Sequence, residues 1–248
     1  MRTLTVIDEA GQMRATRGLA AVLLAGCTAV LGVAGCDSLD NAQRTGDRAD
    51  LANDLATRLG RAESLSYTAE YQLAAGATAI VAQARNPSRV AYTYPGGKLI
   101  LATLAVWDCR AAGSADTCTV AAVPAQTAAP VPPPDTLGVL AGHGIVIAPV
   151  VVGLLNAAAL DSDAALAQRD TTIAGLHATC VRAEGVDNAA ASTFEVCVTT
   201  DGVIGSFTGI VNGNPVELAM AAYRGSVAAD AFDPPAGATI VDTRGGKP

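Results

Sequence analysis

The feature that most constrains the fold is a long succession of short segments in which apolar and polar residues alternate. In 66–73 and 192–200 every second side chain is apolar, which is the period of a strand with one buried face. Turns rich in Asn, Asp, Pro and Gly separate such segments, and strands joined by tight turns pair antiparallel. We therefore expect an antiparallel meander, with strands at 66–73, 77–84, 89–94, 98–108, 117–123, 171–177, 192–200, 203–211 and 215–227 and a short last strand at 237–242.

Two stretches depart from this period. A helix is expected at 48–63, because leucines recur there every four residues. The segment 137–160 carries no charged residue and is hydrophobic enough to suggest a membrane span. Its glycines and Pro149 interrupt it, however, and no basic residue flanks it to set an orientation. We expect two short apolar pieces, 137–148 and 149–160, that cover one face of the sheet as ordinary core or as the wall of a cavity.

Residues 1–35 have the pattern of a bacterial lipoprotein signal peptide. A short basic stretch precedes an uncharged run that ends in small residues just before Cys36. A cysteine in this place can accept a diacylglyceryl group, so Cys36 is predicted to be the lipidated residue. Cys27 is the alternative, since it also follows Leu-Ala-Gly, but cleavage at Cys36 leaves an even number of further cysteines. Acidic residues ahead of Met13 indicate that translation starts at Met13.

The lipid would attach the protein to the extracytoplasmic face of the cell membrane. Residues 36–47 are polar and read as a tether between the lipid and the domain. The single domain is expected at 48–244, followed by a short tail at 245–248.

Four further cysteines fit two disulfides. Cys109 and Cys118 flank one small polar loop, and Cys180 and Cys197 flank another. An exported protein can keep such bonds oxidised. A metal site is disfavoured, because the spacings are not those of zinc-binding pairs and the chain has only 2 histidines.

Composition and motifs narrow the function further. The chain is 50% hydrophobic and 16% charged, which is typical of a folded domain rather than a disordered one. A net charge of −7 without a basic stripe argues against nucleic-acid binding. The sequence contains no G-x-S-x-G motif, and the apolar neighbours of His143 do not suit a general base. We therefore expect a monomer that is not an enzyme, with no catalytic residue, metal or cofactor.

The order of elements resembles a known family. The chain ends in a phrase containing Phe232, Pro235, Gly237 and then Val241-Asp242, and 84–92 is similar to a strand–Pro–strand turn. Over about residues 48–242 this resembles the periplasmic lipoprotein-carrier (LolA-like) superfamily, which includes lipid-carrying actinobacterial lipoproteins of the LppX/LprG kind.

The resemblance implies an α+β fold: an antiparallel sheet curved into an incomplete barrel, its concave face covered by the N-terminal helix and short apolar lid helices at 137–160. It also implies a lipid or other hydrophobic ligand between sheet and lid. The alternative is a lipid-anchored, non-enzymatic interaction or structural module of the cell envelope with a filled core. The residues expected to line the cavity are Trp107, Val139, Leu140, Ile145, Ile147, Val150, Val151, Leu154 and Leu155.

Overall fold

The computed structural model describes residues 36–112, 115–123 and 134–245. The predicted signal peptide at 1–35, with the alternative lipidation site Cys27, lies outside the described residues, as does most of the expected tail. Within the described ranges, none of the helices has the length and hydrophobicity needed to cross a membrane. The expectations for the signal peptide and the lipid anchor therefore stay predictions.

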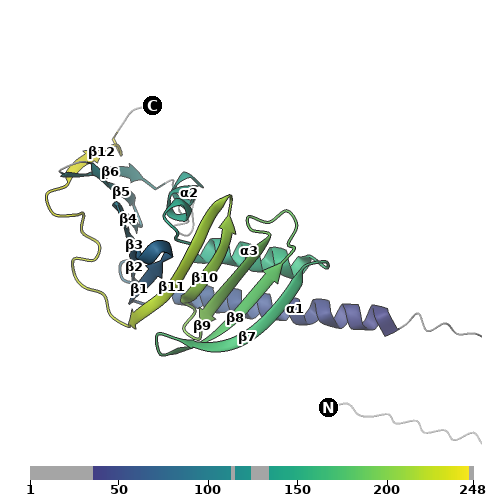
Figure 1. The fold of residues 1–248 in the computed structure, drawn as a ribbon. Helices are drawn as coiled ribbons and strands as arrows, with labels where there is room; N and C mark the ends of the chain where they lie inside the picture. Colours follow the sequence, from purple (N-terminus) through teal and green to yellow (C-terminus); the bar gives the residue numbers. More distant parts are fainter. Residues whose placement is uncertain (1–35, 113–114, 124–133, 246–248) are drawn as a thin grey trace, which may run out of the picture.

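One open sheet of 12 strands organises the molecule, in the order β12-β6-β5-β4-β3-β2-β1-β11-β10-β9-β8-β7. Neighbouring strands are antiparallel, except that β12 runs parallel to β6. The sheet does not close into a barrel, and Figure 1 shows its β1–β6 part bending away from its β7–β11 part. The strands are β1 (Tyr67–Leu73), β2 (Thr78–Ala84), β3 (Arg89–Tyr94), β4 (Gly97–Ala102), β5 (Ala105–Ala112), β6 (Ala115–Ala122), β7 (Ala165–Ile173), β8 (Leu176–Glu184), β9 (Thr193–Thr199), β10 (Ile204–Val211), β11 (Asn214–Arg224) and β12 (Thr239–Asp242).

The expected α+β class and the mainly antiparallel sheet are confirmed. Strands β1–β6 and β7–β11 are two meanders in which consecutive strands pair, as tight turns dictate. The meanders meet where β1 pairs with β11, and a β-bulge lies in this pair between Glu70 and Tyr71.

Helix α1 covers Cys36–Ala62 of the described residues, so it includes residues ahead of the expected start at Arg48. The stretch expected to be a tether, 36–47, is thus helical; it contains no proline that would interrupt the helix. Figure 1 shows this end of α1 projecting beyond the sheet. Further along, Leu55 and Leu59 are fully buried, as their spacing predicted.

The apolar segment forms α2 (Pro134–Gly142) and α3 (Ala148–Leu160), so its expected division into two pieces is present. Gly144 adopts a φ of +76°, which a helix does not allow, and it helps to separate the two helices. Pro149 sits in the first turn of α3, where its missing N–H is not needed. Helix α3 packs along α1 behind the β7–β11 meander, and α2 contacts β11 (Figure 1).

Alternation gives the sheet two unlike faces. The face toward α1 and α3 carries the main core, in which Phe194 and Phe207 are fully buried with ring centroids 6.2 Å apart. The opposite face carries a smaller cluster that includes Ala91, Ile100 and Phe232. Successive residues of a strand point to opposite faces and so belong to different clusters, which explains the period-two pattern of the sequence.

The smaller cluster is completed by the C-terminal segment 225–238, which leads from β11 to β12 (Figure 1). The Arg89 guanidinium lies 4.3 Å from the centre of the Phe232 ring. The Lys98 ammonium donates a hydrogen bond to the Asp233 carbonyl oxygen at 2.6 Å. This segment therefore acts as a strap across β3 and β4.

Two strand expectations are wrong. The stretch expected as one strand at 98–108 is two strands, β4 and β5, whose turn at Thr103-Leu104 contains neither glycine nor proline. The strand expected at 171–177 is instead the β7–β8 hairpin, which turns at Ala174-Gly175 with positive φ at both residues. Strand β7 is an exposed edge strand. Because neither of its faces is well buried, its sequence lacks the apolar–polar alternation that predicts a strand.

Both expected disulfides are present. Cys109 faces Cys118 across β5 and β6, and Cys180 faces Cys197 across β8 and β9, with Cα atoms 3.9 Å apart in each pair. All four residues are buried. Each bond clips one hairpin on the side of the sheet away from α1 and α3.

Candidate functional site

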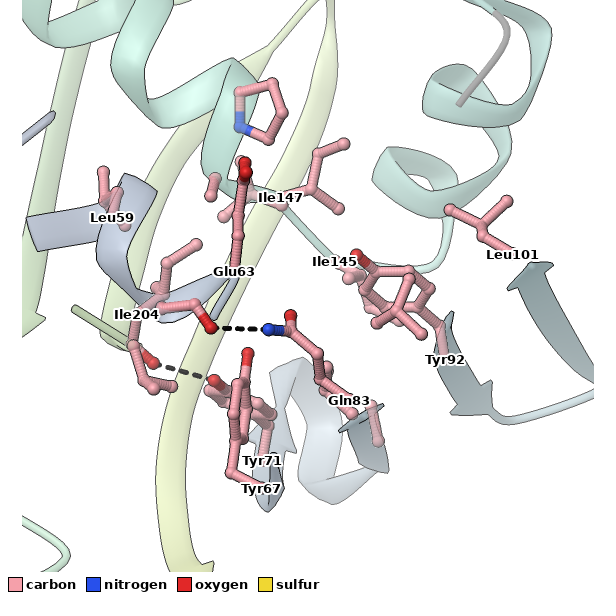
Figure 2. Close-up of a pocket in the computed structure, with 18 of the residues that line it drawn as sticks. Leu59, Glu63, Tyr67, Tyr71, Gln83, Tyr92, Leu101, Ile145, Ile147 and Ile204 are labelled. Atoms are coloured by element: carbon pink, nitrogen blue, oxygen red, sulfur yellow. Dashed lines mark hydrogen bonds between the residues drawn. The ribbon is translucent and has the colours of Figure 1, made fainter. Parts of the chain in front are cut away.

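A pocket opens where the end of α1, strands β1–β4, the segment ahead of α3 and the β9–β10 turn converge (Figure 2). The cavity has a volume of about 150 Å³. The empty space rises to about 1110 Å³ when the solvent-filled mouth is included. The residues that form its walls are Leu59, Ala62, Glu63, Tyr67, Tyr71, Leu73, Ala79, Val81, Gln83, Ser88, Arg89, Val90, Tyr92, Leu101, Ile145, Val146, Ile147, Ala148, Pro149, Gly202, Val203, Ile204 and Leu218.

Tyrosines give the pocket its character. The chain has 5 tyrosines, and Tyr67, Tyr71 and Tyr92 line the pocket. Period-two spacing puts Tyr67 and Tyr71 on one face of β1, and Figure 2 shows them side by side, with Tyr92 opposite. Outside the pocket, Tyr223 stacks on Tyr67 with ring centroids 5.8 Å apart, and Tyr94 stacks on His143 at 4.3 Å.

Two hydrogen bonds fix the polar groups of the wall. The Tyr71 hydroxyl donates to the Ile204 carbonyl oxygen at 2.8 Å. The Gln83 side-chain amide donates to the carbonyl oxygens of Ala62 at 2.5 Å and of Leu65 at 3.3 Å, and so satisfies carbonyls at the end of α1. The first bond joins β1 to β10, and the second joins β2 to the end of α1, so both connect different elements of the pocket wall.

The hydroxyls of Tyr67 and Tyr92 have no hydrogen-bond partner among the residues that the structure describes, and neither is sealed away from all open space. Burial raises the pKa of both tyrosines well above the ordinary value. Burial likewise raises the pKa of Tyr71. All three side chains are therefore neutral at physiological pH, and each hydroxyl keeps a hydrogen that it can donate.

A second cavity, with a volume of about 220 Å³ against about 150 Å³ for the first, lies beneath α2. Its walls come from Gly138, Leu140 and Ala141 of α2, from Val150, from β10–β11 residues Val211, Asn212, Asn214 and Val216, and from Ile145–Ile147. The last three residues also line the first pocket and are buried. The short segment 145–147 is thus the partition between the two spaces.

The structure brings together only part of the predicted cavity set. Ile145 and Ile147 line both spaces, and Leu140 and Val150 line the second. By contrast, Val151, Leu154 and Leu155 are buried in the main core, and Val139 is half-buried on α2; none of these four lines either space.

Trp107 does not belong to the cavity. It packs in the cluster around Phe232, on the opposite face of the sheet. The reason is its parity on β5, because Trp107 points to the same side as Cys109. The tyrosines and Gln83 were not predicted to line the cavity. The sequence shows that residues alternate along their strands, but it does not show which face of the sheet meets the apolar segment.

One cluster of potential metal ligands occurs within the described ranges, formed by Cys180, Glu195 and Cys197. Its sulfurs are joined in a disulfide, and Arg169 pairs with the Glu195 carboxylate at 2.5 Å. Neither thiolate is available to an ion, so this cluster is not a metal site. The pocket walls carry no such cluster among the described residues.

Comparison with known proteins adds little. No protein-family model matches the chain, and no curated protein matches it. The crystal structure of an uncharacterized conserved protein from Thermus thermophilus is similar over 77% of this chain and 98% of its own, with 10% sequence identity and a TM-score of 0.46. A similarity this weak transfers neither fold nor function.

Proposed function

We propose that this protein is a lipid-anchored lipoprotein of the cell envelope that binds or carries a hydrophobic ligand in the tyrosine-lined pocket. The apolar segment 137–160 acts as the lid, and Cys36 carries the lipid. The observation that carries the proposal is the pocket itself: an open, mainly apolar concavity with a few placed polar groups is the usual form of a small-molecule site.

The volume indicates the size of the ligand. An apolar cavity of roughly 150 Å³ holds a molecule the size of benzene. The first pocket therefore takes one ring or a short stretch of chain, and a longer chain would extend through the mouth or, if 145–147 shifts, into the second cavity. Each buried methylene contributes about 0.8 kcal/mol, so affinity arises without any catalytic chemistry.

Native mass spectrometry of a form beginning at Asp37, exported so that the disulfides form, tests this proposal. We expect an added mass that extracts into chloroform and fragments as a lipid. A bare chain in detergent-free preparations, even after lipid is added, would contradict it and favour an interaction module with a filled core.

A matched pair of variants links any bound mass to the pocket. Val90 lines the pocket, whereas Thr93 lies on the same strand with its side chain exposed. Val90→Trp should fill the space and abolish the added mass, and Thr93→Trp should retain it. Loss of the mass in both variants, or in neither, would show that the ligand binds elsewhere.

A further inference from the structure

We infer that the pocket selects ligands whose polar end is uncharged and accepts hydrogen bonds, such as the carbonyl of an amide or ester or a hydroxyl group. This inference rests on the proposed function and adds the chemical class of the ligand's polar end. It derives from three polar groups in the wall and from the placement of the nearby charges.

The first two groups are the hydroxyls of Tyr67 and Tyr92. They come from β1 and β3, on opposite sides of the pocket floor (Figure 2). Each has a hydrogen that no described protein group accepts, and each side chain lines the pocket. Both hydroxyls are open to the pocket space, so a ligand oxygen can take the place of water as the acceptor of each hydrogen bond.

The third group is the carbonyl oxygen of Gln83. Its amide nitrogen donates to the end of α1, which sets the orientation of the amide plane. The oxygen makes no hydrogen bond among the described residues, and Figure 2 shows the Gln83 side chain lying between Tyr67 and Tyr92. An alcohol or a primary amide can donate to this oxygen and accept from a tyrosine, whereas a carboxylate can only accept.

The charges near the pocket do not favour an anion. Arg89 contributes to the wall, but its guanidinium lies over the Phe232 ring on the other face of the sheet. Glu63, whose side chain is exposed, is the acidic residue of the wall. A carboxylate or phosphate in the pocket would therefore lose its hydration without gaining a cation, which is a large cost.

Four ligands with the same eight-carbon chain test the inference: octanamide, octanol, octanoate and octyltrimethylammonium. Their affinities are measured at pH 7.5 by displacement of an uncharged fluorescent dye from the disulfide-bonded protein. We expect the amide and the alcohol to bind at least about tenfold more tightly than either ion. Equal affinities, or tightest binding of octanoate, would overturn the inference, and tightest binding of the ammonium would instead assign recognition to Glu63.

Failure of the proposed function looks different, because then neither the dye nor any of the four ligands binds.

Substitutions assign the preference to the hydroxyls. Tyr67→Phe and Tyr92→Phe should each weaken octanamide binding about three- to tenfold. Tyr223→Phe is the matched control, because its ring stacks on Tyr67 but does not line the pocket. Thermal unfolding confirms that each variant is folded. If the amide-to-octanoate ratio is unchanged when both hydroxyls are removed, the two tyrosines do not set the selectivity.

Discussion

Gly202 lies directly against the backbone of Arg58, so the β9–β10 turn packs on the last turns of α1 without space for a side chain. A Cβ atom on Gly202 would lie 1.7 Å from the Arg58 carbonyl oxygen. Gly202 also has a φ of +85°, where residues with a Cβ are strained. The Asp201-Gly202 turn was expected from the sequence, but its contact with the helix was not.

The first prediction is that Gly202→Ala destabilises the protein strongly. We expect a loss of about 3 kcal/mol or more in the free energy of unfolding, measured with urea, because strain and a backbone clash act together. Gly213→Ala is the control, since Gly213 has a φ of +83° but nothing within 4 Å of the added Cβ. It should cost only about 1 kcal/mol. Similar losses in the two variants would contradict the clash.

The second prediction concerns the disulfides. The sequence separations are 9 residues for Cys109–Cys118 and 17 for Cys180–Cys197. Loop entropy then gives about 2.5 and about 3 kcal/mol, respectively. Replacing either pair by two alanines should lower the free energy of unfolding by at least these amounts. Wild-type protein in strong reductant should lose roughly the sum, and retention of full stability there would contradict the prediction.

The third prediction concerns pH and Asp161. Its carboxylate accepts backbone hydrogen bonds from Asp187 at 2.8 Å, from Asp163 at 3.0 Å and from Ala164 at 3.3 Å. These N–H groups, that of Asp187 foremost, lower the pKa of Asp161. Its stabilising contribution is therefore fully present above the unfolded-state pKa of about 3.9 and is lost as pH falls through the lower folded-state pKa.

Asp161→Asn should accordingly reduce stability at pH 7, and the difference from wild type should shrink in acid below about pH 4. Urea titrations at several pH values measure this. Asp163→Asn serves as the control, since it changes a carboxylate but none of the three hydrogen bonds. A difference that stays constant down to acid would show that Asp161 acts sterically.

The fourth prediction uses the strap. Phe232 is buried with Ala91 and Ile100, and Trp107, the chain's 1 tryptophan, packs against the same cluster. Phe232→Ala should cost about 3 kcal/mol and shift Trp107 fluorescence to longer wavelength, because water reaches the indole. Phe232→Leu should shift it less. An unchanged spectrum would mean that the strap does not cover Trp107.

The sequence predicted those features of the fold that depend on contacts between neighbouring segments of the chain. Turn residues and alternation between neighbouring segments led to the hairpins and to both disulfides, since paired cysteines flank the same turns. The Thr103-Leu104 turn carries no such signal, and Leu104 is apolar although it is 81% exposed. Local patterns fail where a turn uses ordinary residues.

What could not be predicted depends on contacts between distant segments. Trp107 lies outside the cavity because its face of β5 points away from the helices. The alternation of residues along β5 does not reveal which of its two faces meets the helices. Likewise, Tyr67 and Tyr92 face one pocket only because β1, β2 and β3 lie consecutively beneath the end of α1. To the first pocket the apolar segment contributes only residues 145–149, and its other lining residues face the second cavity.

The pairing of β1 with β11 has a consequence for folding kinetics. Each meander is built from neighbours in the chain, whereas this one pair joins Thr68 to Arg224. Hairpins close within microseconds, but a contact between such distant residues must first overcome the entropy of a long loop. The pocket draws on both meanders, through Tyr67 and Leu218, so it is complete only once β1 and β11 have paired. A ligand would therefore slow unfolding without speeding the formation of either half.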